Sequence, residues 1–207
     1  MTAAPETAAT RTDADSMEAR ILDAALARFE KVGVKKTTIE DIARQAGLDR
    51  VTVYRRMGSR DDLVQAVISR EVATVLAEIT ALAESHDMIE DLVAAVFVTV
   101  ITRWRTHPLV ATMLSVEPDR VVSKLTLDGG KQTFDMTVAA TTLMLERAVA
   151  RGLLPAERDL AARAEVVCRI VHSMILAPHG VVDQLLTESD LAEYAHRYLA
   201  PILAEPR

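Results

Sequence analysis

Apolar residues recur at steps of three and four positions along most of this chain, a spacing typical of amphipathic helices. The first clear run contains Ile21, Leu22, Ala25 and Phe29 and stops at Gly33. The alternation of apolar and polar residues that would predict strands is not found over any useful length. Ala, Leu, Met, Glu and Arg are abundant and only 3% of the residues are aromatic, which favours helix over sheet. We therefore predict an all-α fold.

Two short helices should follow the first one. Thr37 and Glu40 form a capping-box pattern, in which the Thr37 hydroxyl accepts from the Glu40 amide while the Glu40 side chain reaches back. This pattern predicts the start of a second helix, which Gly47 ends. Asp49 can then cap a third, short helix over residues 50–56.

Longer helices are predicted for the rest of the chain. Ser59 and Asp62 form a second capping-box pattern, which opens a long helix towards Ala83. Further helices are expected at residues 87–107, 109–115, 118–125, 131–151, 159–176 and 189–203. Pro201 should make the last of them bend or restart, because proline lacks a backbone N–H.

The segment around Gly47 has the spacing of a helix-turn-helix unit, two short helices joined by a tight turn. Ala43 is small where the helices would cross, and Leu48 and Val53 are apolar where they would face inwards. With Val53 inside, a period of 3.6 residues turns four side chains outwards. These are Arg50, Val51, Tyr54 and Arg55, and they can enter a major groove.

The distribution of charge supports a nucleic-acid partner although the net charge is -6. Residues 31–60 hold eight Lys or Arg against three Asp or Glu, a local balance of +5. Residues 71–207 hold twelve basic and nineteen acidic residues, a balance of -7. An acidic body therefore carries a local basic patch, in which Lys35, Lys36 and Arg44 would attract DNA independently of its sequence.

The stretch TTIEDIARQAGLDRVTVYRRMGSRDDLVQAV resembles the DNA-binding region of the tetracycline-repressor (TetR/AcrR) family of bacterial transcriptional regulators. The resemblance covers about residues 17–70 and matches in register at many positions. It departs from the family pattern at Met57, where Phe is usual, and at Arg60, where Lys is usual. It also departs at Val51, where a small residue is common, so the operator sequence cannot be carried over from the family.

The resemblance implies a division of the chain and a set of DNA contacts. Residues 1–15 would be a disordered arm, 16–62 the DNA-binding domain, and 63–207 a regulatory domain for ligand binding and dimerisation. Arg60 would hold a phosphate at the start of the fourth helix, as the family's Lys does, and Arg56 is as readily a salt-bridge partner as a DNA contact. The expected DNA-binding residues are Thr37, Thr38, Arg50, Val51, Thr52, Tyr54, Arg55 and Arg60.

The regulatory domain should bind a small effector and a second copy of the chain. Residues 92–101 are apolar on every face of a helix, so this segment should lie centrally. A hydrophobic or amphipathic effector is expected against Phe97, Trp104, His107, Met113, Phe134, Thr137, Thr141 and Met144. The last two long helices should form the homodimer interface, with Val166, Val167, Ile170, Val171, Met174, Leu191, Tyr194, Tyr198 and Leu199 as candidates. Any of these side chains could instead belong to the core of one chain.

Two other classes of function stay open at this point. Glu165, Cys168 and His172 share one helical face and could hold a metal or activate a thiol, but the apolar neighbours of Cys168 favour inert packing. We therefore expect no catalysis, metal or cofactor. A helical small-molecule-binding protein that does not read DNA is the second alternative, and an activator would share every feature of a repressor.

The expected location is the cytoplasm. The longest apolar stretch, residues 92–102, is about half of what a bilayer-spanning helix needs. Residues 1–20 contain no apolar run like that of a signal peptide. A single cysteine cannot form an internal disulfide. We therefore expect double-stranded DNA, a small effector and a second copy of the chain as partners, and no membrane.

Overall fold

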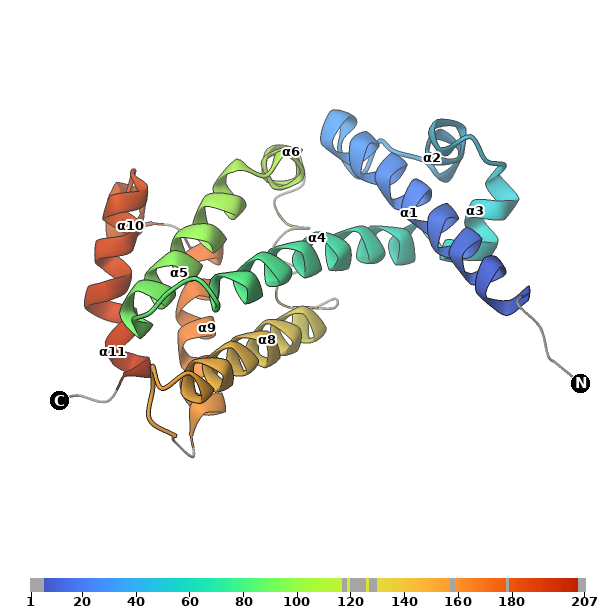
Figure 1. Cartoon of the computed structure of the whole chain (residues 1–207). Coiled ribbons are helices and arrows are strands. Elements are labelled where there is room, and N and C mark those ends of the chain that lie inside the picture. The colour runs from blue at the N-terminus through green and yellow to red at the C-terminus, as the bar shows by residue number, and fades with distance from the viewer. Residues whose placement is uncertain are drawn as a thin grey trace, which may run out of the picture. The chain divides into compact units, whose positions relative to one another are not determined.

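The computed structural model describes residues 6–116, 119, 126, 130–156, 159–177 and 179–204, and every regular element in these ranges is a helix (Figure 1). This confirms the predicted all-α class. Within the described ranges, no helix is both long and apolar enough to cross a bilayer. The short helix predicted at residues 118–125 lies almost entirely outside the described residues.

The chain divides into two compact units. The first unit holds the residues up to Glu71 together with residues 108–121, and the second holds residues 72–107 and those from 122 onwards. The sequence had suggested a single boundary after residue 62, whereas the chain leaves the first unit inside a helix and returns to it at Pro108.

The first unit contains α1 (Glu6–Val32), α2 (Ile39–Ala46), α3 (Arg50–Met57), the first part of α4 (Arg60–Leu82), and α6 (Pro108–Val116). Helix α1 packs against α2, α3 and α6. Its apolar positions are the predicted ones, since Ile21, Leu22, Ala25 and Phe29 are all buried. Helix α1 begins at Glu6, so residues 6–15, which we expected in a disordered arm, are helical. Alanine is frequent in this stretch and is the best helix former.

The side-chain caps of the short helices are mostly those predicted. Asp49 caps α3 by accepting from the Thr52 amide at 2.7 Å. Ser59 and Asp62 cap each other's backbone amides at the start of α4. The capping residue of α2 was predicted one position too early, because Thr38 rather than Thr37 is the N-cap.

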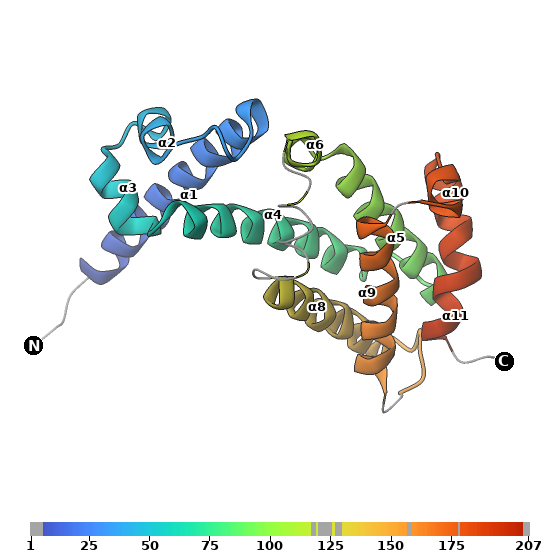
Figure 2. The same cartoon turned by 180° about the vertical axis from the view of Figure 1, so that it is seen from behind.

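The second unit contains the rest of α4, α5 (Ile89–Thr106), α8 (Gly130–Ala150), α9 (Leu160–Leu176) and a 3-10 turn, η1 (Val181–Gln184). A last helical stretch follows as α10 (Glu188–Tyr194), the π-helical η2 (Ala195–Leu199) and α11 (Ala200–Leu203). Helix α5 has most of its apolar residues in the core, as its sequence predicted. Helix α10 packs along α5, and α8 along α9; Figure 2 shows the same pairs from behind.

The last helical stretch restarts where proline was expected to interrupt it. Pro201 cannot donate to the carbonyl of Arg197, one turn earlier, so the regular ladder of hydrogen bonds is broken there. The preceding turn, residues 195–199, widens to π geometry, and Pro201 occupies the first turn of α11. Ala195, Leu199 and Leu203 stay buried through this change, so the stretch continues to cover the core.

Candidate nucleic-acid interface

The turn between α2 and α3 is fixed on both sides. Gly47 has φ 66°, a left-handed conformation in which glycine avoids the strain that a side chain brings. The Leu48 amide donates to the Ala43 carbonyl at 2.9 Å, closing the end of α2. Arg20 of α1 donates to the Ala46 carbonyl at 2.6 Å, which ties this turn to the first helix. The start of α3 is therefore held by α1 as well as by its own cap.

One face of α3 is exposed and carries no internal bonds. Val53 is fully buried and anchors the helix, whereas Val51 is 73% and Tyr54 59% exposed. The charged residues on the helix are exposed too. Within the part of the chain that the structure describes, no hydrogen bond or ion pair engages the side chains of Arg50, Tyr54, Arg55 and Arg56. The predicted outward orientation is confirmed, and these donors are available to a partner.

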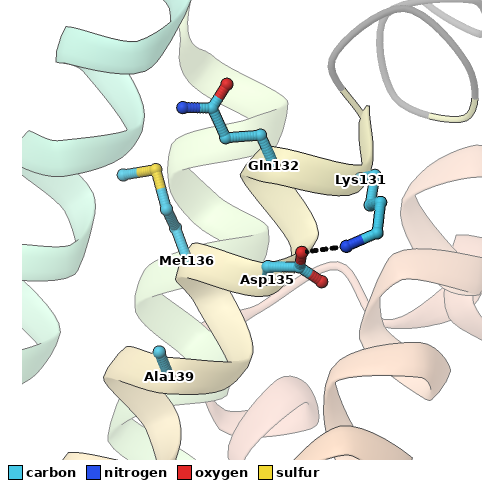
Figure 3. A pocket seen from close by; sticks show the side chains of 5 residues that line it. All are labelled: Lys131, Gln132, Asp135, Met136 and Ala139. Atoms are coloured by element: carbon cyan, nitrogen blue, oxygen red, sulfur yellow. Dashed lines mark hydrogen bonds and ion pairs between the residues drawn. The ribbon is translucent and has the colours of Figure 1, made fainter.

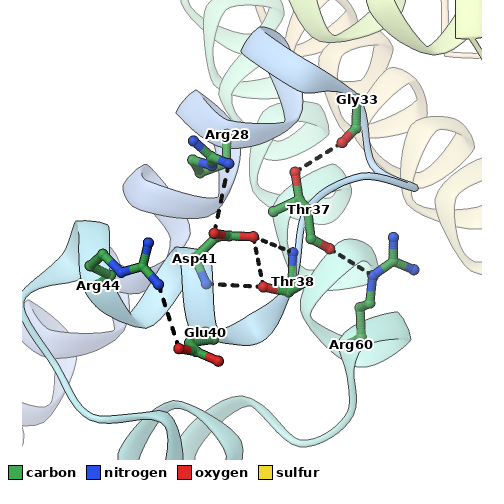
Figure 4. Close-up of polar contacts among 8 residues, drawn as sticks. All are labelled: Arg28, Gly33, Thr37, Thr38, Glu40, Asp41, Arg44 and Arg60. Carbon is green, nitrogen blue, oxygen red and sulfur yellow. Dashed lines mark hydrogen bonds and ion pairs between the residues drawn. The ribbon is translucent and has the colours of Figure 1, made fainter.

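Four of the predicted DNA contacts remain, and two of them, Thr37 and Thr38 at the start of α2, form hydrogen bonds within the protein (Figure 4). Thr37 is only 1% exposed, and its hydroxyl donates to the Gly33 carbonyl at 2.9 Å. Because this hydroxyl is used in the loop, it can neither cap α2 nor reach a phosphate without rearrangement. The Thr38 hydroxyl accepts from the Asp41 amide at 3.1 Å and donates to the Asp41 carboxylate at 2.7 Å.

The other two residues are Thr52 and Arg60. The Thr52 hydroxyl donates to the Asp49 carboxylate at 2.7 Å, within the cap of α3. The Arg60 guanidinium donates to two backbone carbonyls of the loop before α2, with Nε 3.1 Å from the Thr37 oxygen and Nη2 on the Val34 oxygen. The eight predicted residues therefore separate into an exposed set on α3 and a set bonded within the first unit.

The capping carboxylates are held in their charged form. Hydrogen bonds from Thr38, first from its hydroxyl and then from its amide, lower the pKa of Asp41. Hydrogen bonds from Thr52 and Ser59 lower the pKa values of Asp49 and Asp62 in the same way. A negative charge at the start of a helix also suits the helix dipole. Sequence reasoning missed Asp41, although Thr38 and Asp41 have the same spacing as Ser59 and Asp62.

The comparisons with known proteins agree with this architecture. Residues 21–67 match the pattern described as bacterial regulatory proteins, tetR family. An HTH-type transcriptional regulator from Mycobacterium tuberculosis is 28% identical over 175 residues, covering 84% of this chain and 87% of that protein. The HTH-type transcriptional regulator TtgR from Pseudomonas putida is 29% identical over 195 residues, covering 83% of this chain and 86% of that protein.

Residues 21–67 are a TetR-family DNA-binding region. The chain is a DNA-binding transcriptional regulator. The crystal structure of the TetR family repressor AlkX from a Dietzia species has the same fold, with a TM-score of 0.68 and 24% identity over 90% of this chain and 96% of that one. The relatives are regulators rather than enzymes.

Glu165, Cys168 and His172, which could have formed a metal or thiol site, have separate partners. Glu165 pairs with Arg169, and His172 packs edge-on against Phe134 with ring centres 5.6 Å apart. The Cys168 sulfur lies 3.4 Å from the Thr141 hydroxyl, and burial raises the pKa of its thiol. A buried thiol with a raised pKa is a poor nucleophile.

The predicted effector residues belong to both units. Met113 belongs to the first unit, because α6 packs on α1, whereas the other seven belong to the second. Phe97 stacks on Tyr194 at 5.8 Å. Phe134 and Thr141 face α9, through His172 and Cys168. These two side chains of α8 are therefore turned towards a neighbouring helix.

An open hollow lies on the opposite face of α8, towards its start (Figure 3). It offers about 540 Å³ and is lined by Lys131, Gln132, Asp135, Met136 and Ala139. The Lys131 ammonium and the Asp135 carboxylate are 2.5 Å apart, so their charges compensate each other, and this bond raises the pKa of Lys131. None of the five was predicted, because periodicity shows which residues share a face and not which neighbour that face meets.

The predicted dimer residues differ widely in exposure. Val167, Leu191 and Leu199 are buried in the second unit, and Tyr194 is half-buried against Phe97. Ile170, Val171 and Met174 are half-buried and pack on the same core. Val166 is 47% and Tyr198 52% exposed, which leaves these two side chains as the most accessible apolar members of the set.

Proposed function

We propose that this regulator binds a palindromic operator as a homodimer, with α3 of each copy in the major groove, and acts as a repressor in the cytoplasm. The observation that carries the proposal is the exposed face of α3, on which Arg50, Tyr54 and Arg55 have no internal partner. These side chains make no hydrogen bond within the protein, and the helix that carries them is capped by Asp49 and bonded to α1 through Arg20. Such a rigid helix with free donors suits recognition of base edges and phosphates.

The dimer would form through α9 and the last helical stretch. The exposed Val166 and Tyr198, one on each of these elements, support this assignment. Val167, Leu191 and Leu199 serve the core of the single chain instead. Two copies are needed because one module buries too little DNA surface for tight and specific binding.

The effector would be a hydrophobic or amphipathic small molecule, and the open hollow on α8 is the place that we assign to it. Its volume of about 540 Å³ lies within the range of small-molecule sites. Met136 and Ala139 supply apolar contacts and Gln132 a neutral polar group, while the Lys131–Asp135 pair adds no net charge. These features suit an uncharged, largely apolar ligand.

The signal would pass along two covalent connections between the units. Helix α4 runs from one unit into the other, and α5 leads directly into α6. Within the first unit α6 is bonded to α1, because the Thr112 hydroxyl donates to the Glu30 carbonyl at 3.0 Å. An effector that prefers the non-binding conformation by about a hundredfold, roughly 2.7 kcal/mol, would be enough to empty much of an operator.

The proposal is tested by selecting genomic fragments with the purified protein and titrating salt on the enriched DNA. The variant Tyr54→Ala/Arg55→Ala should bind the selected site about a hundredfold more weakly. Arg147→Ala, which removes an exposed charge from α8, is the matched control and should bind like the parent protein. If no sequence is enriched at any salt concentration, DNA reading by α3 is wrong.

A reporter gene placed behind the selected site tests the direction of regulation. Repression predicts that expression falls when the protein is present and recovers in the double variant. A rise in expression would identify an activator. Effector candidates are then tested for release of DNA, with Met136→Trp as a variant that fills the hollow and should weaken release without weakening operator binding.

A further inference from the structure

The loop between α1 and α2, residues 33–38, presents two lysines beside the start of α2. Lys35 and Lys36 are exposed on it. The loop turns through Gly33, which has φ 84°, and is closed by the Thr37 amide, which donates to the Val34 carbonyl at 3.2 Å. The Thr37 hydroxyl adds a bond to the Gly33 carbonyl. These bonds are made within the loop, whereas the fully buried Val34 and the Gly33 amide, which donates to the Phe29 carbonyl at 2.9 Å, hold its first residues against α1 and the core.

Arg60 supplies an attachment to a distant element. It is the first residue of α4, and its half-buried guanidinium bonds the carbonyls of Thr37 and Val34, which precede it by 23 and 26 residues. A positive charge at the first position of a helix opposes the helix dipole, so Arg60 does not serve α4 itself. Its contacts are with the loop, as Figure 4 shows for the bond to Thr37.

We propose that Arg60 is a positioning residue for DNA binding: it holds the α1–α2 loop so that Lys35, Lys36 and the start of α2 meet the DNA backbone. The inference deepens the proposed operator binding and rests on it. It differs from the resemblance, which assigns a phosphate contact to this position. Two of the five N–H donors of Arg60, on Nε and Nη2, are bonded to protein carbonyls.

The chemistry of the side chain explains why arginine stands here. Nε and Nη2 lie on one edge of a planar guanidinium and donate in parallel, so one side chain can bridge two carbonyls. A lysine ammonium is a compact point charge without this fork. A lysine could contact a phosphate as a point charge, but it lacks the planar fork that bridges the Thr37 and Val34 oxygens.

The first measurement is amide hydrogen exchange of the full-length protein without DNA. In Arg60→Lys and Arg60→Ala, residues 33–38 should exchange about tenfold faster than in the parent, because the loop loses its attachment to α4. Arg55→Ala, a matched change on the exposed face of α3, should leave this segment unchanged. Circular dichroism confirms that each variant is folded. Unchanged exchange in both Arg60 variants would overturn the proposal.

The second measurement is operator affinity as a function of salt. Arg60→Lys keeps the charge at position 60 but releases the loop, so the proposal predicts about tenfold weaker binding and a smaller salt slope than in the parent, because the loop lysines lose their phosphate contacts. Arg55→Ala should reduce the slope of log affinity against log salt by about 0.9, as expected for one lost phosphate contact.

Two results in this titration would overturn the proposal. Parent-like affinity of Arg60→Lys, together with a slope reduced by about 0.9 in Arg60→Ala, would assign Arg60 to a phosphate. Faster loop exchange with unchanged affinity would show that the loop does not matter for binding. If the parent itself binds no DNA, the proposed function fails, while the exchange result in the free protein still reports on the attachment.

Discussion

The two units begin their helices in different ways. In the first unit α2, α3 and α4 start at side-chain caps supplied by Thr38, Asp49 and Ser59. In the described part of the second unit α5 and α9 start with no side-chain cap bond, whereas the last helical stretch has one, from Thr187. Short helices contribute little burial and depend on their ends, whereas long apolar helices are held by packing.

This difference also means that the two units tolerate amino-acid substitutions to different degrees. A cap needs a particular residue at a particular position, so the first unit carries a pattern that identifies the family. A core needs only apolar side chains of suitable volume, which many sequences satisfy. The proposed DNA recognition therefore depends on individual residues of the first unit, while the sequence of the second unit can vary without loss of its fold.

The largest effect should come from the core of the second unit. Leu145 of α8 is fully buried, and Leu145→Ala should lower the free energy of unfolding by about 3 kcal/mol, because it leaves a cavity. Chemical denaturation followed by the fluorescence of Trp104, the only tryptophan, reports on this unit. Leu143→Ala on the same helix is the control, since this side chain is 46% exposed. Equal decreases in the free energy of unfolding of the two variants would contradict the view that packing holds the second unit together.

The next largest loss of stability should come from alanine at a glycine with positive φ, and each unit contains such a glycine. Gly47 and Gly152 have φ of 66° and 77°, so alanine at either position should lower stability by roughly 1–2 kcal/mol. An added Cβ meets only the Arg20 guanidinium at 3.4 Å in the first case and nothing within 4 Å in the second. Backbone conformation, rather than space, is therefore what each alanine disturbs.

Only the Gly47 variant should also weaken operator binding, because that turn sets the start of α3. Thermal unfolding and DNA affinity, measured on both variants, check the pair. If Gly152→Ala weakened binding as much as Gly47→Ala, the effect of both would be general destabilisation and not a change at the turn.

Removal of one cap should have a smaller effect. Thr38→Ala leaves the Asp41 amide without its acceptor and should destabilise the first unit by about 1 kcal/mol. Thr38→Ser keeps the hydroxyl and should stay close to the parent protein. Hydrogen exchange of α2 measures the effect locally. Parent-like exchange in Thr38→Ala would mean that α2 is held by its buried face alone.

The bounds of the short helices could be read from the sequence because their signals are local. Asp49, Gly47 and Gly58 mark α3 on both sides, and the structure has them in these roles. The error at α2 has a clear reason. Thr37 and Glu40 fit a capping box as well as Thr38 and Asp41 do, and only the burial of Thr37 in the folded unit decides between them.

The candidate sites were predictable to different degrees. The outward face of α3 follows from the position of Val53, which a helical period determines. The bonding of Arg60 to the loop joins residues more than twenty positions apart, and no local pattern contains it. The same holds for α8, where the period grouped Phe134 with Thr141 but could not tell that this group meets α9.

The smallest effect expected is a difference in acid sensitivity between the units. Asp41, Asp49 and Asp62 of the first unit have pKa values below the ordinary 3.8, because cap hydrogen bonds favour their charged forms. A carboxyl group with a lowered pKa in the folded state stabilises the fold above its unfolded pKa and loses this contribution as the pH falls through the folded pKa. In the second unit, hydrogen bonds from Thr187 lower the pKa of Asp190 in the same way.

Below about pH 4, protection of amides in α2 and α3 should therefore fall before the fluorescence of Trp104 changes. Asp62→Asn is the control, because its amide oxygen can still accept from Ser59 but does not titrate, so the first turn of α4 should respond less to acid. Since these carboxylates are exposed, the shift should be modest and should weaken further in high salt. Simultaneous loss of both signals in the parent protein would mean that the caps do not set the acid stability of the first unit.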